Sequence, residues 1–533
     1  MYKLYQTVNT EYISPVKGTI KGSIPSWVRG SLFRNGPGMY EVGEHKYNHL
    51  FDPLAMLQRF HIEDGEVTYQ CRYLQSDAYK ANIAANRIVV AGLGTSAVPD
   101  PCKNVFQRFM SYFVDSAPLS DNNLISFFPC GDNLYANGES ACVHRIDPNT
   151  LDVIKRVELI DYMPMNTMAA HPHIGPDGTL YSIGVSFQKS GVKTCITKTP
   201  PIQDQESDFV KGESVACIKS PRLLDYSYVH SFAMTENFYV YVEQPVLIDL
   251  IKVLSSTLRQ QPLDKVIRWS PDIKARFRVI HKATGEELSA SWKPGERKTL
   301  VFEAEAFMVY HHINAYEEND HLVMDLVAYS NGELLENVYL KNYTSEQCEN
   351  IARAMKPPQA RRYVLPLNVS AENIKEDNIV KLPKSNASAK VVAKYLVHCE
   401  HEAICDEGFE MPQINYAKYN SKPYHYAYGL GVNNTEKNLF SLVKADVQER
   451  THLKWEEDGC YPSEPVFVGN PDRTTEDDGV IISAINTVEF DKGRHAFLLI
   501  LDARTMSEIA RAEFPDVERF PRDLHGLFRA DGS

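Results

Sequence analysis

Short apolar segments that end at turn-forming residues recur along most of this chain, and they constrain its fold more than any other feature. Segments of this kind, rich in Val, Ile, Tyr and Phe and bounded by Gly, Pro, Asn and Asp, are typical of β-strands. Clear examples are residues 180–187, 238–243, 321–329, 480–485, and the pair 496–501 and 507–514, which a turn at 502–505 separates. The pattern predicts an all-β fold.

Few segments show the spacing of a long helix, and residues 345–355 are the clearest of them. No internal repeat is visible, which argues against a regular solenoid, although a propeller with diverged blades would also hide its period. Because the chain contains no low-complexity segment or Gly/Ser linker, we expect residues 1–533 to form one domain. Residues 374–386, rich in Lys, Asn, Asp and Glu, are expected to form a long surface loop.

Charge and cysteine usage exclude several functional classes. The net charge is −13 and no block of five or six consecutive Lys and Arg residues occurs, so nucleic acid is excluded as the main partner. The ten cysteines include no Cys-x-x-Cys pair, which argues against structural zinc and dithiol redox chemistry and predicts mostly reduced, buried thiols. The N-terminus does not resemble a secretory signal, so we expect a cytoplasmic protein.

Two stretches have the apolar spacing of an amphipathic helix, although no apolar run is long enough to span a bilayer. The stretch from Val246 to Leu258 places Leu and Ile residues on one helical stripe, and the stretch from Val105 to Phe113 does so more briefly. On periodicity alone, an ordinary helix facing the core is favoured over membrane contact.

Four of the 17 histidines lie at the edges of strand-like segments, from which their side chains can point to a shared axis. These are His171, His230, His311 and His525. Taken one at a time, each is more often a hydrogen-bonded core or turn histidine than a metal ligand. Their separations of 59, 81 and 214 residues match no local metal-binding motif.

Three glutamates beside small or aromatic residues give a second clue: Glu139, Glu410 and Glu464. A carboxylate in an apolar setting is costly unless it is paired, and the N–H group of a metal-bound imidazole is a natural partner. A solvated loop glutamate or a structural ion pair explains each one equally well when it is considered alone.

Together these motifs resemble the carotenoid cleavage oxygenase family, in its animal branch. The resemblance extends from residue 30 to 528. It rests on residues 34–38, 49–52, 99–104, the segments around His171 and His230, and residues 311–317, 461–468, 476–479 and 525–528.

The resemblance implies a seven-bladed β-propeller with a cap of helices and loops over the metal-bearing face. It implies that the four histidines bind iron(II), with His311 chosen over His312 because family members place the ligand three residues before an asparagine, here Asn314. Glu139, Glu410 and Glu464 are then expected to accept hydrogen bonds from three of the four imidazoles.

Two further positions follow from the resemblance. Relatives often carry a hydroxylic residue just before the first glutamate, whereas this chain has Gly138, which predicts a less obstructed open position at the iron. Phe51 matches a family motif and is expected to line the substrate tunnel.

The implied activity is cleavage of the central 15,15' double bond of a carotenoid, such as β-carotene or zeaxanthin, by dioxygen to give retinal-type aldehydes. Within the branch, the residues found in the motifs favour an insect-type isomerooxygenase, which makes one 11-cis and one all-trans product. The alternatives are a retinyl-ester isomerohydrolase and an eccentric-cleavage oxygenase. The least favoured hypothesis is a propeller that acts as a scaffold without enzymatic activity.

Because a carotenoid is almost insoluble in water, the resemblance also implies peripheral contact with a membrane, through Val105 to Phe113 and Val246 to Leu258. Cys102 is a position at which an acyl chain is conceivable, but a plain buried or turn cysteine is favoured there.

Overall fold

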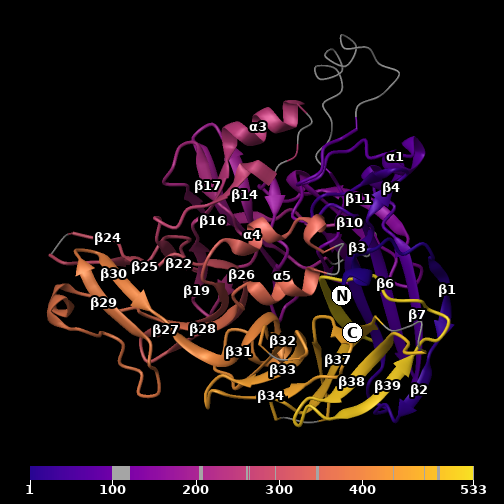
Figure 1. Ribbon diagram of the computed structural model, residues 1–533. Coiled ribbons are helices and arrows are strands. Elements are labelled where there is room, and N and C mark those ends of the chain that lie inside the picture. Colours follow the sequence, from indigo (N-terminus) through magenta and orange to yellow (C-terminus); the bar gives the residue numbers. More distant parts are fainter. Residues whose placement is uncertain are drawn as a thin grey trace.

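Strands dominate the computed structural model of the protein (Figure 1). It describes residues 1–98, 120–202, 208–259, 262, 264–293, 296–343, 347–435, 437–472, 475–488 and 493–531. The all-β prediction is confirmed: the strands expected at 238–243 and 321–329 are β19 (Phe238–Glu243) and β27 (His321–Tyr329), and residues 180–187 lie within β14 (Leu180–Gln188).

The two ends of the chain meet in one sheet. Strand β40, at the C-terminus, pairs with β3, and this pairing places His525 opposite Asn35. The strands of this sheet follow in the order β1 (Tyr12–Lys17), β7 (Glu66–Tyr73), β6 (Leu54–Glu63), β3 (Gly30–Met39) and β40 (His525–Ala530). His525 is therefore held next to the N-terminal segments.

A second sheet also joins the two ends, because β2 pairs with β39. Its members are β2 (Thr19–Gly22), β39 (Glu508–Glu513), β38 (Phe497–Asp502), β37 (Gly479–Thr487), β35 (Cys460–Pro462) and β36 (Val466–Gly469). The predicted turn between β38 and β39 is fixed by Asp502, whose Oδ1 accepts hydrogen bonds from the backbone N–H groups of Arg504 and Thr505, at 3.0 and 2.8 Å.

The middle of the sequence forms further sheets, and three of the larger ones come first along the chain. The first comprises β8 (Ser126–Cys130), β9 (Asn133–Asn137), β10 (Cys142–Ile146) and β11 (Val153–Glu158). The next comprises β12 (Thr167–Met168), β13 (His173–Ile174), β14, β15 (Gly191–Thr199) and β16 (Glu213–Lys219). The third comprises β18 (Ala233–Met234), β19, β22 (Ala275–His281), β25 (Val301–Ala304), β30 (Leu396–Glu400) and β29 (Ser388–Ala393).

The longest path of paired strands runs through the orange part of Figure 1. It comprises β26 (Met308–Glu318), β27, β28 (Gln359–Pro366), β31 (Glu402–Gln413), β32 (Tyr426–Val432), β33 (Phe440–Asp446) and β34 (Thr451–Trp455). The first half of β31 pairs with β28 and the second half with β32. This strand therefore links two parts of the path.

Helices are short and few among the described residues. They are α1 (Asp77–Ala85), α3 (Leu250–Arg259), α4 (Glu333–Asn337), α5 (Cys348–Ala354) and α6 (Tyr416–Tyr419). The helix expected at 345–355 is thus α5, which is shorter than predicted. None of the described helices combines the length and the hydropathy that a membrane span needs.

The prediction of one amphipathic helix from Val246 to Leu258 is wrong in its first part. Val246–Asp249 forms strand β20, which pairs with β17 (Asp225–Ser227) and β21 (Ile267–Trp269), and Leu247 is fully buried there. Strand pairing has overridden the helical spacing in this segment. The helix begins only at Leu250. Cys102 and the stretch from Val105 to Phe113 lie outside the described residues.

The predicted surface loop begins with a single 3-10 turn, Ala371–Lys375. Most residues from 376 to 386 are exposed, and the buried Ile379 and Val380 anchor the segment to the core.

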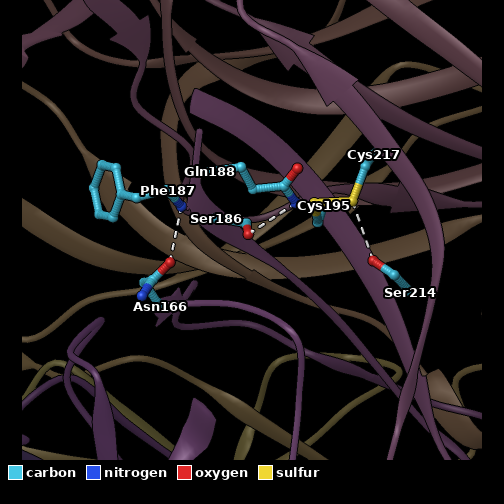
Figure 2. The surroundings of a disulfide bond; sticks show 7 residues. All are labelled: Asn166, Ser186, Phe187, Gln188, Cys195, Ser214 and Cys217. Atoms are coloured by element: carbon cyan, nitrogen blue, oxygen red, sulfur yellow. Dashed lines mark hydrogen bonds between the residues drawn. A yellow bond between two sulfur atoms is a disulfide. The ribbon is translucent and has the colours of Figure 1, made fainter. Parts of the chain in front are cut away.

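Seven of the described cysteines are free and buried, as predicted: Cys71, Cys130, Cys142, Cys348, Cys399, Cys405 and Cys460. Cys195 and Cys217 are the exception, because they form a disulfide across the antiparallel pair β15 and β16 (Figure 2). The disulfide closes a segment of 22 residues.

Candidate metal centre

Four histidines that are far apart in the sequence converge at one point. His171 lies between β12 and β13, and His230 lies between β17 and β18, so loops present both rings. His311 belongs to β26 and His525 begins β40, so strands present the other two. One ring nitrogen from each residue lies within 4.8 Å of the others. The structure thus brings together all four predicted ligands.

The spacing of these nitrogens fits one metal ion. The Nε2 atoms of His171 and His230 are 3.2 Å apart, and those of His311 and His525 are also 3.2 Å apart. Metal–nitrogen bonds of about 2.0–2.1 Å place adjacent nitrogens of an octahedral site about 3 Å apart and opposite nitrogens about 4 Å apart. A hydrogen bond between imidazoles needs only two rings. It therefore does not explain why four rings meet at one point.

The choice of His311 over His312 agrees with the geometry. The Nδ1 atom of His312 lies 2.8 Å from the hydroxyl of Ser231 and is not part of the cluster. Adjacent residues of a strand point to opposite faces, so only one member of the doublet can reach the shared point.

Each of the three predicted glutamates contacts one imidazole of the cluster. Nδ1 of His230 lies 2.6 Å from Glu139, and Nδ1 of His311 lies 2.6 Å from Glu410. Nδ1 of His525 lies 2.9 Å from Oε1 of Glu464. When Nδ1–H donates to a carboxylate, the lone pair of Nε2 is left to face the shared point, and this is the tautomer that a metal requires.

His171 differs from the other three. Within the part of the chain that the structure describes, no carboxylate is hydrogen-bonded to its ring. Burial lowers the pKa of His171 well below its ordinary value, and the neighbouring imidazoles lower it further. This ring is therefore neutral and ready to act as a ligand without a proton being removed.

The electrostatics of His311 and His525 differ as well. Burial acts to lower the pKa of His311, but the charge and hydrogen bond of Glu410 outweigh it and the pKa is raised. Burial lowers the pKa of His525, and the opposing effect of Glu464 does not reverse this. A metal must therefore compete with a proton more strongly at His311 than at His525.

The groups that hold the glutamates were not predicted from the sequence. The hydroxyl of Tyr228 donates to Glu139 at 2.8 Å, and that of Tyr329 donates to Glu410 at 2.7 Å. Burial, together with the adjacent carboxylate, raises the pKa of both phenols well above the ordinary value, which keeps them protonated donors. Tyr228 precedes His230 by two residues, a spacing that was visible in the sequence.

Glu464 is held by a cation instead. Nη1 of Arg34 lies 2.7 Å from Oε2 of Glu464, and Nε of the same guanidinium lies 2.6 Å from Asp523. The backbone N–H of Gly526 donates to the same Oε2 at 2.9 Å. Arg34 belongs to a motif quoted for the family resemblance, but its role was not predicted.

Gly138 and Phe51 are also close to this region. A Cβ atom added to Gly138 would lie 2.6 Å from Cα of Asn123, so glycine is required there for close packing against a neighbouring backbone segment. Phe51 packs against the core cluster that contains Ala170 and Leu524, the residues just before His171 and His525. The roles predicted for Gly138 and Phe51 remain predictions.

The fold and the site define a class: a β-rich protein with a buried cluster of four histidines that could hold a metal ion, three of them hydrogen-bonded to glutamates. The chain belongs to the retinal pigment epithelial membrane protein (RPE65) family, whose model matches residues 5–530. This match confirms the family resemblance.

Similar proteins cover almost the whole chain. The rat (Rattus norvegicus) beta,beta-carotene 15,15'-dioxygenase is 39% identical over 528 residues, which are 98% of this chain and 90% of the relative. The human (Homo sapiens) protein of the same name is 38% identical, covering 98% and 93%. The mitochondrial carotenoid-cleaving dioxygenase of Macaca fascicularis is 38% identical, covering 96% and 92%.

Solved structures support the fold. Cobalt-substituted ACO from Synechocystis superimposes with a TM-score of 0.75 at 21% identity, covering 99% of this chain and 98% of that one. An ACO/RPE65 chimera gives the same TM-score, identity and coverage.

Proposed function

We propose that this protein is a non-haem iron(II) dioxygenase that cleaves the central 15,15' double bond of carotenoids to retinal-type aldehydes. The observation that carries the proposal is the convergence of four imidazoles, with adjacent Nε2 atoms 3.2 Å apart. The rat, human and mouse beta,beta-carotene 15,15'-dioxygenases are 38–40% identical to this chain, which supports this reaction, and mitochondrial carotenoid-cleaving dioxygenases follow at 37–38%.

The four imidazoles are compatible with iron but do not select it. Imidazole is a good ligand for divalent iron, copper and zinc alike, so the choice of iron rests on the family and on the dioxygen chemistry. Iron(II), when bound by His171, His230, His311 and His525, supplies the redox chemistry that activates dioxygen. Four protein ligands leave up to two positions of an octahedral ion for other molecules.

The residues of the chain act by holding and orienting the site. Glu139, Glu410 and Glu464 fix three imidazoles as neutral ligands and supply negative charge that offsets the charge of the metal. Glu410, Glu464 and three of the imidazoles are less than a tenth exposed, so the chain limits the access of bulk water. No side chain is needed as a general acid or base, because oxidative cleavage of a double bond requires no proton transfer.

Phe51 is proposed to line the substrate path, because it is half-buried beside the segments that carry His171 and His525. Gly138 is proposed to leave a position at the iron unobstructed. The packing of Gly138 against Asn123 is a separate reason for a glycine at this position.

We also propose that the sheets form a seven-bladed propeller with a cap of helices and loops, and that the molecule contacts a membrane peripherally from the cytoplasmic side. Three exposed apolar side chains support the contact: Leu223 (77% exposed), Leu224 (54%) and Ile251 (57%). They lie together, because the backbone N–H of Leu250, the first residue of α3, donates to the carbonyl of Leu224. We further propose that cleavage is coupled to isomerisation, so that one product is 11-cis and the other is all-trans.

The test is to incubate iron-loaded protein with β-carotene, zeaxanthin or retinyl ester, with and without dioxygen, and to resolve products by chain length and cis/trans geometry. We expect C20 aldehydes from the carotenoids only with dioxygen. His311→Ala should abolish them, whereas His61→Asn, remote from the site, should not. Retinol formed from the ester without dioxygen would replace the proposal with isomerohydrolysis, and products of unequal length would indicate eccentric cleavage.

A further inference from the structure

A second group of metal-binding side chains lies on β31 and β34, away from the four histidines. It consists of Cys405, Asp406 and His452, whose potential ligand atoms all lie within 4.8 Å of one another. Cys405 and Asp406 are adjacent on β31, and His452 is on β34. These elements lie in the orange part of Figure 1.

An irregularity in β31 explains how two adjacent residues reach the same point. Gln359 of β28 is opposite Gly408, but Arg361, only two residues later, is opposite Ala403. Four residues of β31 therefore correspond to one residue of β28, so the strand bulges at 404–407. In a regular strand, Cys405 and Asp406 would point to opposite faces.

The histidine has the environment of a metal ligand. Its Nδ1 lies 2.8 Å from Oδ1 of Asp406, and its Nε2 lies 3.5 Å from Oε1 of Glu407. With Nδ1 facing the metal, Nε2–H points to Glu407, and a carboxylate behind a ligating imidazole is the usual arrangement in metal sites. The ring of His452 thus has an acceptor on one side and the thiol and Asp406 near the other.

The charges balance for a divalent cation. A thiolate and one carboxylate supply two negative charges, which offset the metal. The charge of Glu407 is offset by Lys454, whose Nζ lies 3.6 Å from Oε1. The Cys405 thiol is buried beside these groups, and it loses its proton when it binds a cation.

The donor set selects the cation. One thiolate, one imidazole and one carboxylate are typical ligands of zinc, which prefers four tetrahedral ligands. Tetrahedral ligand atoms are about 3.3–3.8 Å apart at normal zinc bond lengths. The three atoms here require only small side-chain movements to reach this spacing. Asp406 is 80% exposed, so water can complete the coordination.

We propose that Cys405, Asp406 and His452 form a second metal site, which binds zinc and clamps the bulge of β31 to β34. Strand β34 is the last strand of its path, and within the described part of the chain it pairs with β33 alone. A clamp at this position fixes an edge strand that backbone hydrogen bonds hold on one side alone. The alternative explanation is an ion pair between His452 and Asp406 without a metal, and such a pair requires no buried thiol beside it. The experiment below separates a metal site from an ion pair.

The test uses full-length protein, kept free of oxygen and without added reductant so that the Cys195–Cys217 disulfide stays closed, with its four-histidine site already loaded with iron. Cobalt(II) is added while absorption is followed for the near-ultraviolet charge-transfer band of a cobalt–thiolate bond. Because the four-histidine site contains no sulfur, it cannot produce this band. We expect the band to saturate at one cobalt per chain and to disappear when zinc is added.

Matched variants locate the ligand. Cys405→Ala and His452→Gln should each lose the band, whereas Cys399→Ala, at another buried cysteine of the same core cluster, should keep it. Glu407→Gln should keep the band while weakening zinc binding by about 10–100-fold. If Cys405→Ala does not fold, the His452→Gln variant alone tests whether the band needs this site. The side chain of His452 is 23% exposed, so its replacement should be tolerated. Absence of the band in the wild type, or its persistence in either ligand variant, would overturn the proposal.

Discussion

Arg34 and Glu464 form an ion pair in the interior of the protein, with Nη1 of Arg34 2.7 Å from Oε2 of Glu464 and side-chain exposures of 0% and 3%. Burial acts to raise the pKa of Glu464, but His525 and Arg34 lower it to about 2. The carboxylate is therefore charged at every physiological pH. Arg34 thus orients His525 through Glu464, although it does not touch the ring.

Replacing Arg34 with methionine should be strongly destabilising. The substitution leaves two buried carboxylates, Glu464 and Asp523, without a cation, and removal of one partner of a buried pair costs about 3–5 kcal/mol. Chemical denaturation of the metal-free protein measures the loss. Arg29→Met is the control, because Arg29 is 46% exposed and its ion pair with Glu63 is worth about 0–1 kcal/mol. Equal losses in the two variants would show that the buried pair is not important for stability.

Changing each of the three glutamates to glutamine should weaken metal binding without removing a ligand. The amide still accepts a hydrogen bond from Nδ1–H, but it no longer carries the charge that offsets the metal. We expect iron affinity to fall by about 10–100-fold in Glu139→Gln, Glu410→Gln and Glu464→Gln, as measured by competition with a chelator. Glu317→Gln is the control: Glu317 shares β26 with His311 but accepts its hydrogen bonds from Thr235 and Asn237 rather than from an imidazole of the cluster. Wild-type affinity in the three variants would contradict the charge argument.

The strands could be predicted because their signals are local. Residues 238–243 and 321–329 are bounded by turn residues and rich in β-formers, and the strands have the same bounds. The segment 246–249 shows the limit of this approach: its spacing suits a helix, but pairing with β17 and β21 makes it a strand. Which face a segment buries is decided by residues that are distant in the sequence.

The metal centre could not have been found from spacing. His525 reaches the other imidazoles only because β40 pairs with β3 at the opposite end of the chain, and no local pattern encodes that pairing. The family resemblance pointed to the four histidines and the three glutamates that the structure brings together. It did not supply Tyr329 or Arg34, whose functions depend on side-chain contacts across 81 and 430 residues.

Asp121 should make stability depend on pH in the acidic range. Burial acts to raise its pKa, but hydrogen bonds with His144 and two backbone N–H groups at the start of α1 lower it to about 2. A carboxyl group whose folded pKa is lowered stabilises the protein above its unfolded pKa, and this contribution disappears as the pH falls toward the folded pKa. A shift from 3.8 to about 2 corresponds to about 2 kcal/mol.

Asp121→Asn should therefore be less stable than the wild type by about 2 kcal/mol at pH 6, and the difference should shrink as the pH falls from about 4 toward 2. Denaturant unfolding at several pH values measures it. A difference that stays constant with pH would show that the loss comes from packing rather than from the charge of the carboxylate.

Reduction of the Cys195–Cys217 disulfide should loosen the sheet that carries it. The bond links paired residues of β15 and β16 and closes a segment of 22 residues, for which the entropy of loop closure corresponds to about 3 kcal/mol. Among the described strands β16 pairs with β15 alone, so it is an edge strand there and should respond most. Hydrogen exchange should therefore accelerate in β15 and β16 when a reductant is added, while β26 and β40, which hold two of the four histidines, should be unaffected. A Cys195→Ser/Cys217→Ser variant should show the fast exchange with or without reductant. If the wild type exchanges equally fast in both states, the backbone ladder alone holds β16 in place and the disulfide contributes nothing measurable.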